Sequence, residues 1–168
     1  DRYIDNGVSI KWPNDIYWND RKICGILVEH SLSGGKIDHT IAGIGLNINQ
    51  EKFLSDAPNP VSLRQIIGCD TPLPDVLHHL SEELLRLADS LPDNAESLHA
   101  EFLSRLYRRN GLHTYRNVAD RTADHLAAGE EFCAEIADVA PYGILTLARP
   151  DGSRPRFAFK EVEFVIGK

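Results

Sequence analysis

The chain has 168 residues, of which 42% are hydrophobic and 26% charged, and its formal net charge is −7. That length allows one hydrophobic core, or one core with a small second domain. The negative charge argues against non-specific nucleic-acid binding, which needs a basic surface. No apolar run approaches the length of a membrane-spanning helix. We therefore expect no nucleic-acid partner and no membrane partner. The lack of a signal peptide at the start favours the cytoplasm.

Cysteine and histidine patterns give no sign of a metal centre. Cys24, Cys69 and Cys133 are odd in number and lack C-x-x-C spacing, which indicates neither a disulfide framework nor a zinc site. The seven histidines are scattered along the chain. We expect no metal held by protein ligands. The chain contains no methionine and opens with Asp1-Arg2-Tyr3, so we expect it to be part of a longer translation product.

The first third of the chain predicts an antiparallel sheet. Residues 1–7 resemble the end of a helix, because Asn6-Gly7 is a helix stop signal. Strand segments are then predicted at residues 11–17, 22–29 and 41–49. Asn19-Asp20 and Gly34-Gly35 lie between them and are typical of two-residue hairpin turns.

These turns predict a definite register. If Trp18 pairs with Arg21, Tyr17 lies opposite Lys22 and Asp15 opposite Cys24. If Ser33 pairs with Lys36, the predicted pairs are Lys22 with Asn47, Cys24 with Gly45, and Ile26 with Gly43. Asp15, Lys22 and Asn47 would then project from one face over a glycine floor, with Cys24 as a small filler beside them. The opposite face would be apolar, with Ala42, Ile44, Leu46 and Ile48. A slip of one residue would reverse every side chain.

Helices are predicted after a proline-containing loop at residues 51–61. Ser62 and Gln65 form a capping-box pattern for a short helix that ends at Gly68. A longer amphipathic helix is predicted at about 75–91, with a leucine stripe, and another at about 94–109, with a break at Pro92. We expect both stripes to pack on the apolar back of the sheet. A surface for a partner protein is the alternative interpretation.

The last third predicts a small β-barrel. Strand runs occur at 113–118, 132–139, 144–148, 156–159 and 162–166, and a polar insertion fills residues 119–130. The predicted fold class is therefore α+β: an antiparallel or mixed sheet backed by helices in residues 1–112, followed by a β-barrel in residues 113–168.

Three motifs together resemble biotin protein ligases, the biotin–[acetyl-CoA-carboxylase] ligases. The first is Lys11-Trp12-Pro13-Asn14-Asp15, and the second is Lys22 followed by Gly25-Ile26-Leu27-Val28-Glu29. The third is Gly43-x-Gly45-x-Asn47. The C-terminal strands, with Gly143 to Leu147 and Lys160-Glu161-Val162, resemble the Src-homology-3-like domain of the same family. The resemblance thus covers nearly the whole chain.

The resemblance implies a two-step reaction. The family activates biotin with ATP and Mg²⁺ to biotinyl-5′-AMP, then transfers biotin to a lysine of a biotin carboxyl carrier domain. It implies that Lys22 contacts the carboxylate and phosphate region, and that Asp15 lies near the acceptor lysine. By the same resemblance, Asn14, Asn47 and Gly45 lie on the adenylate side, the backbone meets ligand at Gly25, and Trp12 lies close to the ligand. A homodimer is a further expectation.

The sequence also departs from the family. The glycine- and arginine-rich loop of the family (Gly-Arg-Gly-Arg-x-Gly) would precede Lys11 and does not occur here, and neither does a helix-turn-helix domain. The chain therefore resembles the C-terminal portion of a ligase. We expect these 168 residues alone to have little activity, because that loop encloses biotin and the phosphates.

Other interpretations remain open. Without the family resemblance, Lys22 and Asp15 could form an ordinary surface ion pair, worth under about 1 kcal/mol. A lipoate–protein ligase is a neighbouring enzyme class. A module that binds an adenylate or a carrier domain without catalysis is a third interpretation, favoured by the missing phosphate loop.

Overall fold

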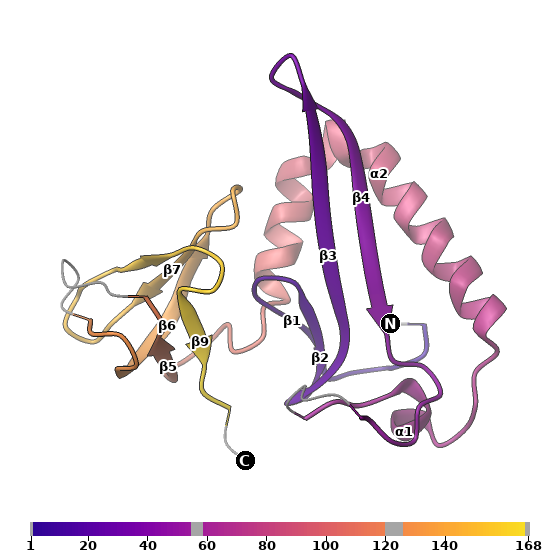
Figure 1. The fold of residues 1–168 in the computed structure, drawn as a ribbon, viewed down its shortest axis with the longest axis horizontal. Helices are drawn as coiled ribbons and strands as arrows, with labels where there is room; N and C mark the ends of the chain where they lie inside the picture. Colours follow the sequence, from indigo (N-terminus) through magenta and orange to yellow (C-terminus); the bar gives the residue numbers. More distant parts are fainter. Residues whose placement is uncertain (1, 55–58, 120–125, 167–168) are drawn as a thin grey trace. The chain divides into compact units, whose positions relative to one another are not determined.

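The computed structural model describes residues 2–54, 59–119 and 126–166 (Figure 1). The helices and strands, in chain order, are β1 (Val8–Lys11), β2 (Asp15–Trp18), β3 (Arg21–Ser33), β4 (Lys36–Leu46), α1 (Leu63–Ile67), α2 (Leu73–Ser104), β5 (His113–Asn117), β6 (Glu131–Val139), β7 (Leu145–Ala148), β8 (Arg156–Phe157) and β9 (Val162–Phe164). The α+β class predicted from the sequence is confirmed. No helix in the described part of the chain is long and apolar enough to cross a membrane.

The chain divides into two compact units, Asp1–Ala95 and Glu96–Lys168. The sequence placed the boundary near residue 112, where the barrel strands begin. The division falls within α2, and residues just after α2 are bonded to the second unit. Arg108 Nη1 donates to the Val165 carbonyl at 2.9 Å, and Arg109 Nη1 donates to the Ile136 carbonyl at 2.6 Å.

The first unit contains an antiparallel sheet in the order β1-β2-β3-β4. The predicted single strand at 11–17 is wrong, because β1 and β2 are separate strands joined at Trp12–Asn14. Pro13 has no backbone N–H for a sheet ladder, and its peptide bond with Trp12 is cis. The predicted helix end at 1–7 is also wrong for residues 2–7, which contain no helix. Tyr3 and Ile4 instead pack on the apolar cluster of the sheet.

Two β-bulges change the predicted register. The turn pairs Trp18–Arg21, Tyr17–Lys22 and Ser33–Lys36 are confirmed. Beyond Tyr17 the β2–β3 pairing shifts by one residue, and beyond Leu32 the β3–β4 pairing shifts by one residue. The predicted partners of Asp15 and Cys24 are therefore wrong. The observed pairs are Asp15–Gly25, Gly25–Gly45, Ile16–Cys24 and Cys24–Leu46.

The back of this sheet is apolar, as predicted. Of the four residues predicted there on the third strand segment, Ala42 is exposed, and Ile44, Leu46 and Ile48 are partly buried. Ile23, Cys24, Val61 and Leu63 form a buried cluster. The partly buried residues around it include Ile16, Ile26, Ile44, Leu46 and Ile48. Helix α1 begins with the predicted capping box of Ser62 and Gln65 and ends at Gly68, which has a φ of 82°. These local signals were sufficient to define the helix.

The two predicted long helices are one element, α2, with a kink at Asn94. Pro92 thus precedes a kink and does not end the helix. The predicted packing of the leucine stripe on the sheet is wrong from its start, since Leu77 is 64% exposed, although Val76 beside it is buried. A groove of about 440 Å³ lies between the first turns of α2 and the sheet. It is lined by Ile44, Leu46, Ile48, Leu73, Pro74, Val76, Leu77 and Leu80. Farther along, the predicted packing is wrong, since Leu84 and Leu91 are 43% and 52% exposed.

The second unit contains a five-stranded antiparallel sheet in the order β8-β7-β6-β5-β9. Strand β6 alternates exposed and buried residues along most of its length, as expected for a barrel wall. Ring contacts join Tyr115, Phe132, Phe157 and Phe164 in its core. The five predicted strand runs are confirmed with small changes in their ends. Residues 120–125 of the predicted insertion lie outside the described residues.

Candidate functional site

An ion pair joins the two residues for which the family resemblance implies catalytic roles. Lys22 Nζ lies 2.6 Å from Asp15 Oδ1, with 30% and 17% of the two side chains exposed. Lys22 is the second residue of β3, and Asp15 begins β2. The predicted proximity of the two is therefore confirmed. A pair at this distance and exposure has lost part of its water but can still reach a ligand.

Glycine makes room for this pair. Asp15, Gly25 and Gly45 lie side by side across β2, β3 and β4. A β-carbon placed on Gly25 would lie 3.2 Å from Lys22 Nζ and 3.4 Å from Asp15 Oδ1. The lysine side chain therefore crosses over Gly25 to reach the carboxylate. A β-carbon on Gly45 would meet only open surface, with the Gly25 carbonyl oxygen nearest at 3.7 Å.

The bulge in β3 places Lys22 and Gly25 on one face. Ile23 is the extra residue, so Ile23 and Cys24 both belong to the buried cluster on the other face. The prediction of Cys24 as a filler on the polar face is wrong for this reason. Burial raises the pKa of Cys24 to about 11, with a smaller contribution from Asp15. Cys24 is thus a packed thiol rather than a nucleophile.

Asn14 holds the turn that carries Asp15. Asn14 Nδ2 donates to the Ile26 carbonyl at 2.6 Å, and the Ile26 N–H donates to the Asn14 carbonyl at 2.8 Å. This double contact extends the β2–β3 ladder by one residue beyond Asp15. Trp12, in the same turn, is buried, with 3% exposed.

Asn47 does not lie opposite Lys22 as predicted, because of the second bulge. Its backbone N–H donates to the Ile23 carbonyl at 2.9 Å, and its Nδ2 donates to the Val61 carbonyl at 3.1 Å. The segment Asn59–Val61 beside Lys22 was not identified from the sequence. The isolated Gly25 in a strand was a signal for a bulge in β3, but no signal marked the contact with Asn59–Val61.

The arrangement suits an anionic ligand with a reactive carbonyl group. A lysine ammonium offers three donors, so Lys22 can bond Asp15 and a phosphate oxygen together. Asp15 can accept a proton from an attacking amine. Leu27 follows Gly25 on the same face and is 59% exposed, which gives an apolar neighbour to the glycine floor. Among the described residues, no group of three or more His, Cys, Asp and Glu side chains could hold a metal ion.

Comparison with known sequences shows a similarity to one family over the first part of the chain. The model of the biotin/lipoate A/B protein ligase family matches residues 1–47, which include Asp15, Lys22, Gly25 and Gly45. The bifunctional ligase/repressor BirA of Bacillus subtilis is 37% identical over 77 residues, covering 43% of this chain and 23% of that protein. The biotin–[acetyl-CoA-carboxylase] ligase of Paracoccus denitrificans is 46% identical over 41 residues, covering 24% of this chain and 17% of that protein. The matches thus span less than a quarter of either relative.

Comparison with solved structures extends the similarity to both units. The apo biotin protein ligase of Aquifex aeolicus has a TM-score of 0.69 at 18% identity. The match covers 95% of this chain and 66% of that one. The segment that carries the Lys22–Asp15 pair is therefore similar to the biotin/lipoate A/B protein ligase family, and the chain has the fold of a biotin protein ligase.

Proposed function

We propose that the chain is the part of a biotin protein ligase that holds biotinyl-5′-AMP and its acceptor lysine. The observation that carries the proposal is the Lys22–Asp15 pair lying across Gly25, within the segment that matches the ligase family. Structures of the A. aeolicus ligase with biotin and ATP, and of the Leishmania major ligase with biotinyl-5′-AMP, have the same fold. Both support a ligand of this chemical class.

In the first step, a biotin carboxylate oxygen attacks the α-phosphorus of ATP, and pyrophosphate leaves. Negative charge builds on the phosphate oxygens as the new bond forms. Lys22 supplies fixed positive charge there, and Asp15 holds the ammonium in place before the ligand arrives. ATP would bring Mg²⁺ as part of the substrate, since a triphosphate supplies most of the oxygen ligands of that ion.

In the second step, the amine of a carrier-domain lysine attacks the carbonyl carbon of biotinyl-5′-AMP. The C–N bond forms, the bond from carbon to the phosphate oxygen breaks, and AMP leaves. The amine must lose a proton, and the Asp15 carboxylate is the base that the structure offers beside the ammonium of Lys22. The acceptor is therefore a lysine on a biotin carboxyl carrier domain.

Titration calorimetry with the 168-residue protein tests this proposal. The ligands are biotinyl-5′-AMP, lipoyl-5′-AMP and AMP. We expect biotinyl-5′-AMP to bind most tightly. Lys22→Ala should weaken it about 10- to 100-fold, because hydrogen bonds to charged groups contribute about 1.5–3 kcal/mol. Lys36→Ala, at the exposed tip of the β3–β4 hairpin, is the matched control and should bind as wild type does.

The alternatives give different results in the same experiment. Tighter binding of lipoyl-5′-AMP would indicate a lipoate ligase. Binding of AMP as tight as that of biotinyl-5′-AMP would indicate a module that recognises the nucleotide without biotin. Equal affinities for Lys22→Ala and Lys36→Ala would contradict the assignment of Lys22.

A homodimer is a further part of the proposal. In the described sheet β4 is an edge strand, and its Ile37 and Ile41 are 61% and 59% exposed. An exposed edge strand with apolar side chains favours pairing with another strand. Light scattering at increasing concentration should show the dimer, and Ile41→Lys should shift it toward monomer. A cytoplasmic location remains a prediction from the sequence.

A further inference from the structure

At Lys22 the neighbour of strand β3 changes from β4 to another segment of the chain. Strand β4 ends at Leu46, which is paired with Cys24, so β4 does not reach Lys22. The segment Asn59–Val61 takes this place beside β3. The Lys22 N–H donates to the Asn59 carbonyl at 3.0 Å, and the Val61 N–H donates to the Lys22 carbonyl at 2.9 Å. Lys22 is thereby held by Tyr17 on one side and by this segment on the other.

Three side chains hold the segment Asn59–Val61 in turn. Arg21 Nη2 donates to the Pro60 carbonyl at 2.9 Å. Asn47 Nδ2 donates to the Val61 carbonyl at 3.1 Å, and Asn59 Nδ2 donates to the Asp20 carbonyl. Each of the three residues of the segment is therefore bonded to β3, to the turn before it or to the end of β4. Val61 is fully buried, so this contact has little freedom to shift.

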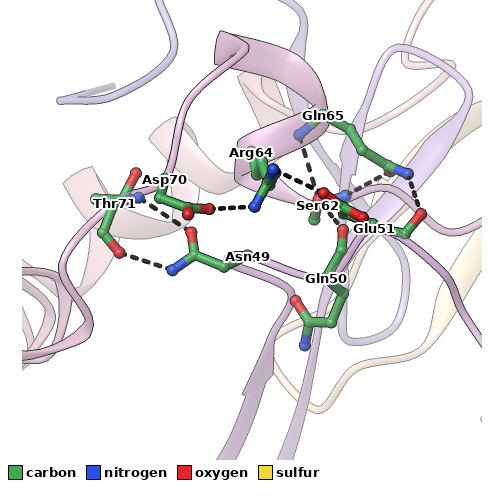
Figure 2. A network of polar contacts seen from close by, with 8 residues as sticks. All are labelled: Asn49, Gln50, Glu51, Ser62, Arg64, Gln65, Asp70 and Thr71. Atoms are coloured by element: carbon green, nitrogen blue, oxygen red, sulfur yellow. Dashed lines mark hydrogen bonds and ion pairs between the residues drawn. The ribbon is translucent and has the colours of Figure 1, made fainter.

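A second network holds the next residues along the chain, as Figure 2 shows. Ser62 Oγ donates to the Gln50 carbonyl at 2.6 Å, and Arg64 forms ion pairs with Glu51 and Asp70. Arg64 stabilises α1 at the surface but does not contact the segment Asn59–Val61. It therefore provides a matched arginine whose loss loosens α1 and leaves the contacts of Lys22 in place.

We propose that Arg21 is a positioning residue for Lys22, acting through the segment Asn59–Val61, with Asn47 as the second fixing point. The inference rests on the proposed function, because the residue that Arg21 would position is Lys22. Lys22 sits next to the bulge at Ile23, where the regular ladder of the strand is interrupted. From this backbone position its ammonium reaches Asp15 at 2.6 Å. Loss of the Arg21 contact frees the segment, and the Lys22 backbone then moves away from Asp15.

The first test follows the lysine side chain without any ligand. The protein is labelled with ¹⁵N-lysine, and the side-chain ammonium signal of Lys22 is identified by its absence in Lys22→Arg. The six lysines of the chain keep such a spectrum simple. We expect an observable Lys22 signal in wild type, because a paired ammonium exchanges slowly with water. Arg21→Met keeps the aliphatic stem, removes the donor, and should broaden or shift that signal.

Two further variants give this test its controls. Arg21→Lys restores one donor and should recover part of the wild-type signal. Arg64→Gln should leave the Lys22 signal unchanged, although it lowers stability. A backbone amide spectrum shows that each variant is folded. A Lys22 signal that is identical in wild type and in folded Arg21→Met would overturn the proposal, and so would equal changes in Arg21→Met and Arg64→Gln.

The second test is a double-mutant cycle on affinity for biotinyl-5′-AMP. A displacement of about 1 Å can cost about 100-fold in a positioned site, so partial loosening by Arg21→Met should cost about tenfold. In a Lys22→Ala background, Arg21→Met should weaken the affinity for biotinyl-5′-AMP by less than about twofold, because the ammonium that Arg21 positions is absent. Additive losses would contradict a role through Lys22. Absence of binding by wild type would contradict the proposed function, while the ammonium signal still decides the role of Arg21.

Discussion

Gly25→Ala is the most informative single change in the site. The added methyl group would lie 3.2 Å from Lys22 Nζ, 3.3 Å from Lys22 Cε and 3.4 Å from Asp15 Oδ1. The first two distances are shorter than ordinary carbon contacts, so the lysine side chain must move by a few tenths of an ångström. The backbone itself tolerates alanine, since Gly25 lies in a strand and has no positive φ. The perturbation therefore acts on the ion pair and spares the fold.

The structure predicts separate magnitudes for stability and for function. Losing the geometry of a partly exposed pair should cost the fold under about 1 kcal/mol. A hydrogen bond to a charged group contributes about 1.5–3 kcal/mol, so displacing the Lys22 ammonium should weaken binding of biotinyl-5′-AMP about 10- to 100-fold. We thus expect a folded protein with nearly wild-type stability and a clear functional defect.

Urea unfolding and binding of biotinyl-5′-AMP, measured on the same preparations, test this separation. Gly43→Ala is the matched control, because its added methyl group would have the Leu27 carbonyl oxygen nearest, at 3.8 Å. The control should unfold in urea and bind biotinyl-5′-AMP as wild type does, because its methyl group does not reach Lys22. A Gly25→Ala protein that binds biotinyl-5′-AMP within twofold of wild type would refute the reasoning about Gly25. A large loss of stability in Gly25→Ala would mean that the glycine is needed for the backbone of β3 rather than for the ion pair.

Four further predictions concern other residues. Asp15→Asn should slow transfer from preformed biotinyl-5′-AMP to a carrier domain by about 10²–10⁴, as for a lost general base, and should slow adenylate formation less; single-turnover rates that fall equally would contradict this. At pH 8 iodoacetamide should modify exposed Cys69 and Cys133 but not buried Cys24, whose raised pKa keeps it protonated, so intact mass should show two additions rather than three. The same pKa shift, from 9.0 to about 11, means that the folded state keeps a proton which the unfolded chain loses, so stability should fall as the pH rises through this range. Ser62→Ala should lower the free energy of unfolding by about 1–2 kcal/mol in urea, because the hydroxyl caps α1 and is fully buried; an unchanged midpoint would refute it.

Local sequence signals predicted the elements that depend on nearby residues. The capping box of Ser62 and Gln65 and the stop at Gly68 gave α1 its ends, and the turn dipeptides placed Trp18 opposite Arg21. Those turns also predicted that Asp15 and Lys22 project from one face, where they form an ion pair. Each of these features is determined by residues close in the chain, whose turn and capping chemistry the sequence displays directly.

Features that depend on distant packing were missed. Each of the two bulges shifts its strand pair by one residue, and strict alternation cannot foresee them. Cys24 therefore lies in the core and not on the predicted polar face, and Asn47 does not lie opposite Lys22 as predicted. The contact of Asn59–Val61 with Lys22 joins residues nearly forty positions apart, and no local signal marks it.

The most direct test of the central claim is to watch Lys22 while biotinyl-5′-AMP binds. The protein is labelled with ¹⁵N-lysine and titrated with the ligand, and the ammonium signal of Lys22 is followed together with the backbone amide signal of Lys36. The account predicts that the Lys22 signal shifts with saturating ligand, because its ammonium bonds a phosphate oxygen as well as Asp15, while the signal of Lys36 stays in place. A complex that forms with the Lys22 signal unmoved would contradict the account.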